Sequence, residues 1–94
     1  MADLLYRGTQ YVRDSATLWR GAIGGVLLLP SGAPESWYIT TPGDVIWDLL
    51  VKPYSIDQLV KALSIKFHEP SATVFSDIEL VMRTLHEIGA IRSF

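Results

Sequence analysis

The pattern of hydrophobic and polar positions divides this chain into a front half typical of strands and a back half typical of helices. Branched and aromatic residues over 9–19 favour a first strand, and the continuous apolar run over 26–29 predicts a second, buried one. Residues 36–40 alternate, so that Trp37 and Ile39 share one face of a third strand. The sequence therefore predicts a three-stranded sheet in the front half.

Turn-forming residues separate these strands. Gly21, Gly24 and Gly25 predict a hairpin turn after the first strand, and the Pro, Ser and Gly residues over 30–34 predict a second turn. Short turns favour a simple antiparallel order. This order leaves the first and third strands at the edges of the sheet.

A helix is expected to follow the third strand with almost no loop between them. Pro42 suits a first helical turn, because an N–H at that position has no partner inside the helix and its absence costs no hydrogen bond. Thr40 or Thr41 would be the N-cap. Pro53 would stop this helix. Its expected buried stripe consists of Val45, Ile46, Leu49 and Leu50.

Two more helices are predicted. Ser55 and Gln58 have the spacing of a capping box, which predicts a helix start there. The third helix is expected to begin near Ser71, after Pro70, and to end at Gly89. Apolar residues recur at helical spacing in both. In the second helix they are Ile56, Leu59, Val60, Leu63 and Phe67, and in the third Val74, Phe75, Ile78, Val81, Met82, Leu85 and Ile88.

Together these elements predict an α+β fold, in which an N-terminal three-stranded antiparallel sheet precedes a three-helix bundle. Winged helix-turn-helix domains join a sheet to helices in this way. The 94 residues suit one domain spanning 1–94.

Nothing in the sequence indicates a signal peptide, and the most apolar run, 22–29, is too short to span a bilayer. With no cysteine, the chain fits a reducing cytoplasm, so we expect a cytoplasmic protein with no membrane partner.

Catalysis is not expected. His68 and His86 lie on different elements and lack the spacing of a helical zinc pair, so no metal site is predicted. The serines lack the G-x-S-x-G elbow of a nucleophile, and the glycines over 21–25 do not form a dinucleotide-binding motif. We therefore expect neither enzymatic activity nor a cofactor.

Nucleic-acid binding is also disfavoured. The formal net charge of −2 gives no electrostatic attraction to phosphates. A recognition helix needs basic or amide side chains on its exposed face. The third helix instead exposes Ser76, Asp77, Glu79, Arg83 and Glu87.

A peptide remains as a partner. An exposed sheet edge offers unpaired N–H and C=O groups that an extended peptide can satisfy by adding a strand. If the third helix flanks the third strand, the helix would supply side-chain pockets beside that edge. Ile78 and Leu85 are expected in the core, whereas Val81 lies on the flank of the apolar stripe and suits either role. Asp77 lies at the border between buried and exposed faces, and Leu80, nearly opposite the stripe, is expected to be exposed.

Three segments together resemble the PqqD family, the small leader-peptide recognition elements of pathways that make ribosomally synthesised, post-translationally modified peptides. They are residues 39–50 (ITTPGDVIWDLL), 54–59 (YSIDQL) and 76–91, and the resemblance extends over about 16–91. The strand-to-helix entry ending at Gly43, the Ile46-Trp47 pair and the Asp77-Ile78 start match the family pattern. Thr40 stands where the family often has Asn, and Glu79-Leu80 reverses the usual apolar-acidic order.

The resemblance implies a non-catalytic adaptor that binds the leader peptide of a precursor, antiparallel to the third strand and against the third helix. It is most similar to the stand-alone leader-binding partner of lasso-peptide pathways, which works beside a leader peptidase and a cyclase. The alternatives are a peptide chaperone of the quinone-cofactor (PQQ) type, which serves a radical enzyme, and a winged-helix DNA-binding regulator. The peptide-binding residues implied are Ser36, Trp37, Tyr38, Ile39, Val74, Asp77, Ile78, Val81 and Met82.

Overall fold

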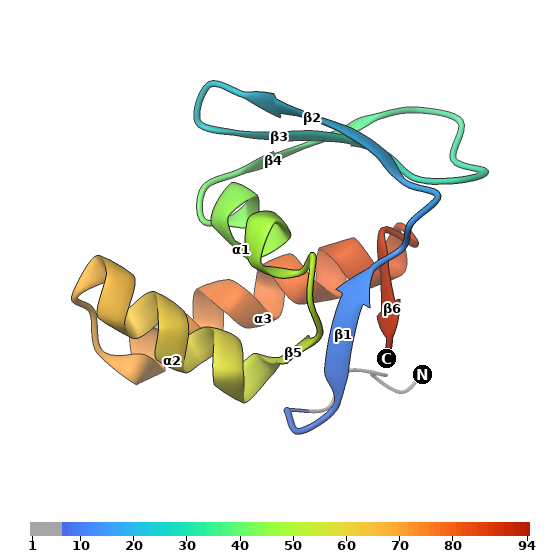
Figure 1. The fold of residues 1–94 in the computed structure, drawn as a ribbon. Coiled ribbons are helices and arrows are strands. Elements are labelled where there is room, and N and C mark those ends of the chain that lie inside the picture. Colours follow the sequence, from blue (N-terminus) through green and yellow to red (C-terminus); the bar gives the residue numbers. More distant parts are fainter. Residues whose placement is uncertain (1–6) are drawn as a thin grey trace.

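The chain folds into two small antiparallel sheets and three helices, as a computed structural model describes for residues 7–94 (Figure 1). The predicted α+β class, with a three-stranded sheet and three helices, is confirmed. This sheet has the order β2-β3-β4, formed by β2 (Leu18–Ala22), β3 (Gly25–Leu29) and β4 (Trp37–Thr40). β4 pairs with β3 alone, so it is an edge strand.

The sequence did not predict the second sheet. It has the order β5-β1-β6 and is formed by β1 (Gln10–Arg13), β5 (Tyr54–Ser55) and β6 (Ile91–Ser93). The single strand expected over 9–19 is therefore wrong, because it consists of two strands that belong to different sheets. Thr17 N–H donates to the carbonyl of Asp14 across a turn, and this turn separates β1 from β2.

Helix α1 (Gly43–Leu49) follows β4 after a two-residue connection. Its N-cap is Pro42 and no side chain caps it, so the expected threonine cap at Thr40 or Thr41 is wrong. Instead, the Asp44 carboxylate accepts from the N–H of the next residue. Trp47 is fully buried, as are two members of the predicted stripe, Ile46 and Leu50; the other two, Val45 and Leu49, are partly buried.

Helix α2 (Ile56–Phe67) begins with the predicted capping box. The Ser55 hydroxyl accepts from the N–H of Gln58 at 3.1 Å, and the Gln58 side chain accepts from the N–H of Ser55 at 2.8 Å. Both bonds satisfy amides that lack a partner inside the helix.

Helix α3 (Ser71–Glu87) ends as predicted near Gly89, which has φ +80°. Gly89 N–H donates to the His86 carbonyl and Ala90 N–H donates to the Leu85 carbonyl, the two bonds of a Schellman motif. This turn directs the chain back along β1 as β6.

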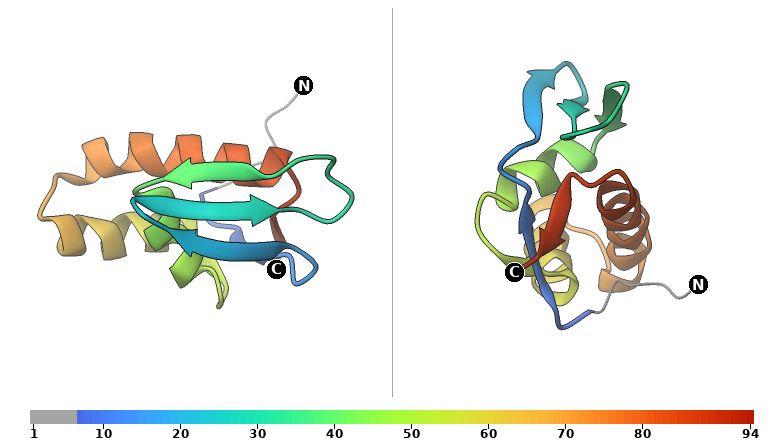
Figure 2. Two further views of the ribbon diagram at one scale, coloured as in Figure 1. Left: turned by 90° about the horizontal axis from the view of Figure 1, so that it is seen from above. Right: turned by 90° about the vertical axis from the view of Figure 1, so that its right-hand side faces the viewer.

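Helix α1 lies between the β2–β3–β4 sheet and the α2–α3 pair (Figure 1). Val26 and Leu28 on the inner face of β3 are buried in the core together with Ile46 and Trp47 of α1. No described element covers the opposite face of the sheet (Figure 2), where Leu18 is 68% exposed. Among the described residues, none of the helices combines the length and the apolar character required to cross a membrane.

Arg13 joins the two sheets to α1. Its guanidinium carbon lies 4.8 Å from the ring centre of Trp19 on β2 and 4.6 Å from that of Trp47 on α1. Its Nε donates to the Trp47 carbonyl at 2.8 Å. Burial lowers the pKa of Arg13, and the Asp48 carboxylate opposes this effect. The side chain is only 17% exposed, so these contacts form in a partly dry environment where cation–π attraction is strong.

Candidate functional site

The free edge of β4 is the first component of the site. Thr41 N–H donates to the Gly24 carbonyl at 3.1 Å, so the amide of Thr41 points toward β3. Successive residues of an antiparallel strand direct their N–H and C=O groups to alternate sides. Tyr38 and Thr40 therefore direct theirs away from β3, into the space beside the sheet. In the described chain, no backbone hydrogen bond outside the sheet uses these groups.

Helix α3 provides the facing wall. Its core stripe is made by Val74, Ile78, Met82 and Leu85. A second stripe is offset from the core stripe by about 100° around the helix, the angle of one residue. Its members have the i, i+3, i+4, i+7 spacing of one helical face and are Asp77, Leu80, Val81 and Thr84.

A groove of about 330 Å³ lies between this second stripe and β4. We call it the β4–α3 groove. Viewed from above the sheet, α3 runs alongside β4 on the open side of the strand (Figure 2). The groove is lined by Tyr38, Ile39, Thr40, Thr41, Pro42, Asp77, Leu80, Val81 and Thr84. Leu80 is 67% exposed, so its side chain is accessible to a partner in the groove.

Two glycines allow the strand to take this position. A Cβ atom at Gly25 would clash with the Ile39 carbonyl oxygen and would lie 3.0 Å from the Tyr38 ring, so glycine at this position leaves room for β4 and for the ring that rests across β3. The Tyr38 hydroxyl donates to the Ile23 carbonyl in the β2–β3 turn, which orients the ring. Gly43 likewise lets the start of α1 approach Ile39 closely.

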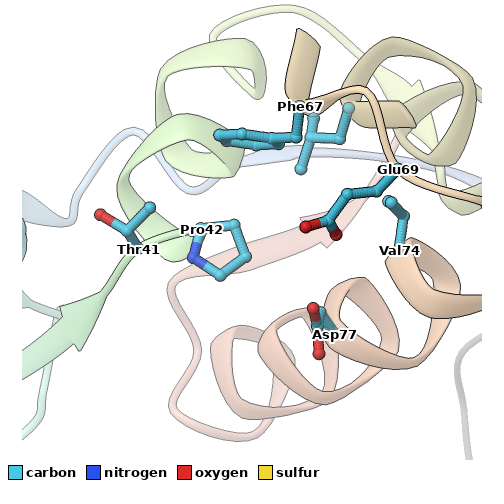
Figure 3. Close-up of a pocket in the computed structure, with 7 residues that line it drawn as sticks. Thr41, Pro42, Phe67, Glu69, Val74 and Asp77 are labelled. Atoms are coloured by element: carbon cyan, nitrogen blue, oxygen red, sulfur yellow. The ribbon is translucent and has the colours of Figure 1, made fainter. Parts of the chain in front are cut away.

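A smaller pocket of about 180 Å³ continues the β4–α3 groove beyond the end of β4 (Figure 3). We call it the end pocket. It shares Thr41, Pro42 and Asp77 with the groove, and its other walls are Leu63, Phe67, Glu69 and Val74. Glu69 reaches from the α2–α3 connection over the space between Pro42 and Val74, and Asp77 faces that space from α3 (Figure 3).

The residues predicted from sequence are divided between the groove and the core. Tyr38, Ile39, Asp77 and Val81 line the β4–α3 groove together. Val74 is only 4% exposed, but it forms a wall of the end pocket.

The remaining predicted residues do not form the groove surface. Ile78 and Met82 are fully buried in the core beneath it. Ser36 precedes β4 and Trp37 begins it, and neither of them lines the groove.

Sequence reasoning included Val74 and Asp77 of the end pocket in the site, but not Leu80 or Thr84 of the groove, nor the other residues of the end pocket, which are Thr41, Pro42, Leu63, Phe67 and Glu69. The signal for Leu80 and Thr84 was present, because the spacing of Asp77, Leu80, Val81 and Thr84 marks one helical face. No local pattern could indicate that Phe67 and Glu69 meet Pro42, since these residues come from separate helix ends.

Chemically, the arrangement can bind an extended chain. The strand edge offers main-chain hydrogen bonds and the helix offers apolar and acidic side-chain contacts. Within residues 7–94, no group of three or more His, Cys, Asp or Glu residues is placed to hold a metal ion.

Comparisons with protein-family models, with curated proteins and with solved structures find no match to this chain.

Proposed function

We propose that this protein is a non-catalytic adaptor that binds the leader peptide of a ribosomally made precursor. The observation that carries the proposal is the free edge of β4, where Tyr38 and Thr40 direct their main-chain groups toward the β4–α3 groove. The resemblance of residues 39–50 and 76–91 to leader-recognition elements of the PqqD family supports the same role. The winged helix-turn-helix architecture of that family is part of the proposal.

In this proposal the leader adds antiparallel to β4, and its alternate side chains point into the groove. Leu80 and Val81 supply apolar contacts, while Asp77 supplies a charge. The interface would be smaller than the standard size of about 1,600 Å². A few well-seated anchor residues can still give useful affinity at that size.

The adaptor would hold the precursor beside the enzymes that process it, a leader peptidase and a cyclase of a lasso-peptide pathway. Tethering raises the local concentration of the core peptide at an enzyme bound to the same adaptor. The alternative within this family is a chaperone that delivers its precursor to a radical enzyme of quinone-cofactor synthesis. The genes beside this one distinguish the two pathways.

A DNA-reading role receives less support from the charges on α3. Asp77, Glu79 and Glu87 lie on its outer surface. The Arg83 Nη2 atom lies 3.7 Å from Oε2 of Glu79, so this carboxylate partly neutralises the positive charge of the arginine. Phosphates would meet more negative than positive charge there. We therefore expect no retardation of duplex DNA at moderate salt.

The proposal is tested by titrating the 94-residue protein with a synthetic peptide. The proposal requires a short precursor frame beside the gene; the peptide carries the leader segment of that precursor, and anisotropy or calorimetry reports binding. We expect saturable binding that Val81→Glu abolishes. No saturation up to about 100 μM, weaker than typical specific recognition, would overturn the proposal. Tight, salt-sensitive binding to duplex DNA instead would favour the regulator.

A further inference from the structure

We infer that the end pocket is a subsite for one basic side chain, a lysine or arginine, of the bound peptide. This inference rests on the proposed function, because it assumes that an extended peptide occupies the β4–α3 groove. It adds to that function a requirement on the peptide's sequence.

The size and position of the end pocket indicate a single side chain. Its volume of about 180 Å³ equals that of roughly six liquid waters of 30 Å³ each. A space of this size accepts one long side chain but not a run of several residues. Because it begins at Thr41 and Pro42, just past the last residue of β4, it lies beyond the paired strand. In an antiparallel pair, the partner residues opposite the C-terminal end of β4 are N-terminal. The subsite therefore receives a residue immediately N-terminal to the paired segment of the peptide.

The walls of the end pocket select the chemistry of that side chain. Phe67, Leu63, Val74 and Pro42 form apolar walls, while the Glu69 and Asp77 carboxylates face the same space (Figure 3). In the described part of the chain, neither carboxylate has an ion pair or a side-chain hydrogen bond, and no cationic side chain lines the pocket.

A purely apolar side chain would remove water from both carboxylates without replacing it, and an anionic one would be repelled. Lysine and arginine instead place an apolar stem along apolar walls and keep a charged head at the polar mouth. An arginine could also stack on the Phe67 ring. A long basic side chain is therefore the class that satisfies both kinds of wall.

The experiment uses a library of random dodecapeptides displayed on phage and selected on the immobilised full chain. Selections are run on the parent protein, on the Glu69→Gln/Asp77→Asn double variant and on a Glu35→Gln/Glu87→Gln control. Both double variants remove two charges, but Glu35 and Glu87 line neither the groove nor the end pocket. Circular dichroism checks that each variant is folded.

We expect one position in the parent pool to be enriched in lysine or arginine, and the enrichment to persist with the control and disappear with the end-pocket variant. In a selected peptide, replacing that residue by methionine should weaken binding to the parent about tenfold and leave binding to the end-pocket variant unchanged. The inference is overturned if groove-bound peptides show no basic position, or if the methionine change weakens binding equally to both proteins. In that case Val81→Glu still abolishes binding and the proposed function stands. If the library yields no binder, or only peptides that bind Val81→Glu like the parent, the proposed function fails as well.

Discussion

The side chain of Ile39 on β4 fills the space that a Cβ atom at Gly43 would occupy. The Ile39 Cγ2 and Cβ atoms are its nearest neighbours, followed by Cγ1 of Val81 at 3.8 Å. This close approach fixes the distance between β4, the start of α1 and the groove wall of α3.

Gly43→Ala should therefore destabilise the protein by about 1–3 kcal/mol, the usual cost of overpacking a closed site. Gly21→Ala is the matched control, since nothing lies within 4 Å of a Cβ at that position. The control should change stability by less than about 1 kcal/mol. Urea denaturation followed by circular dichroism measures both. Equal midpoints for the two variants would contradict the packing described for Ile39.

A proline scan of β4 tests the direction of its free amides. Tyr38→Pro removes an N–H that faces the open edge, so it should weaken binding of the leader peptide while the sheet persists. Trp37→Pro removes an N–H that faces β3, so it should mainly destabilise the fold. Calorimetric titration and urea denaturation of both variants separate the two effects. The alternation would be refuted if Trp37→Pro lost binding alone and Tyr38→Pro lost stability alone.

Charge in the β4–α3 groove should prevent peptide binding without unfolding the protein. Val81→Glu places a carboxylate beside Asp77 in the groove, where it would have to be desolvated by a bound peptide. We expect no detectable binding, so that the loss of affinity exceeds tenfold, or about 1.4 kcal/mol. Val51→Glu is the control, because Val51 is 63% exposed and lies outside the groove. If both folded variants bind like the parent, the peptide lies elsewhere, and the free edge of β2 is the next candidate.

Arg13 should contribute to stability through its place between Trp19 and Trp47. Arg13→Lys keeps the charge but loses the planar stacking and the Nε bond to the Trp47 carbonyl. We expect a loss of about 1–3 kcal/mol, together with a change in tryptophan fluorescence. Arg20→Lys, at an exposed position on β2, should change neither. An Arg13→Lys protein as stable as the parent would show that the contact between Trp19 of β2 and Trp47 of α1 depends on apolar packing alone.

The helices could be predicted from sequence because their signals are local. The capping box at Ser55 and the Schellman turn at Gly89 each involve residues a few positions apart. The second sheet could not, because β1 pairs with β5 and β6, and no short-range pattern encodes such distant partners. Asp14 and Ser15 are turn formers, and they were the available signal that the strand expected over 9–19 breaks.

The candidate site was predicted in outline and missed in detail for a geometric reason. The sequence identified β4 and α3 as its walls, which are the elements that line the groove. Hydrophobic periodicity, however, finds the face of a helix that packs on its own core, and so it favoured Ile78 and Met82. The face that meets β4 is mixed in polarity, with Asp77 and Thr84 beside Leu80, and periodicity gives such a face little weight.

The two walls of the β4–α3 groove come from chain segments on either side of α1. Neither wall forms the groove by itself, so the groove exists only when α1 has docked the sheet against the helices (Figure 1). A peptide that binds there binds the native state and not the unfolded chain. A bound peptide must then increase the free energy of unfolding of the whole domain, by about 2.7 kcal/mol when free peptide exceeds its Kd a hundredfold. The melting temperature rises accordingly. Thermal stability thus reports peptide binding at the groove, without any label on either molecule.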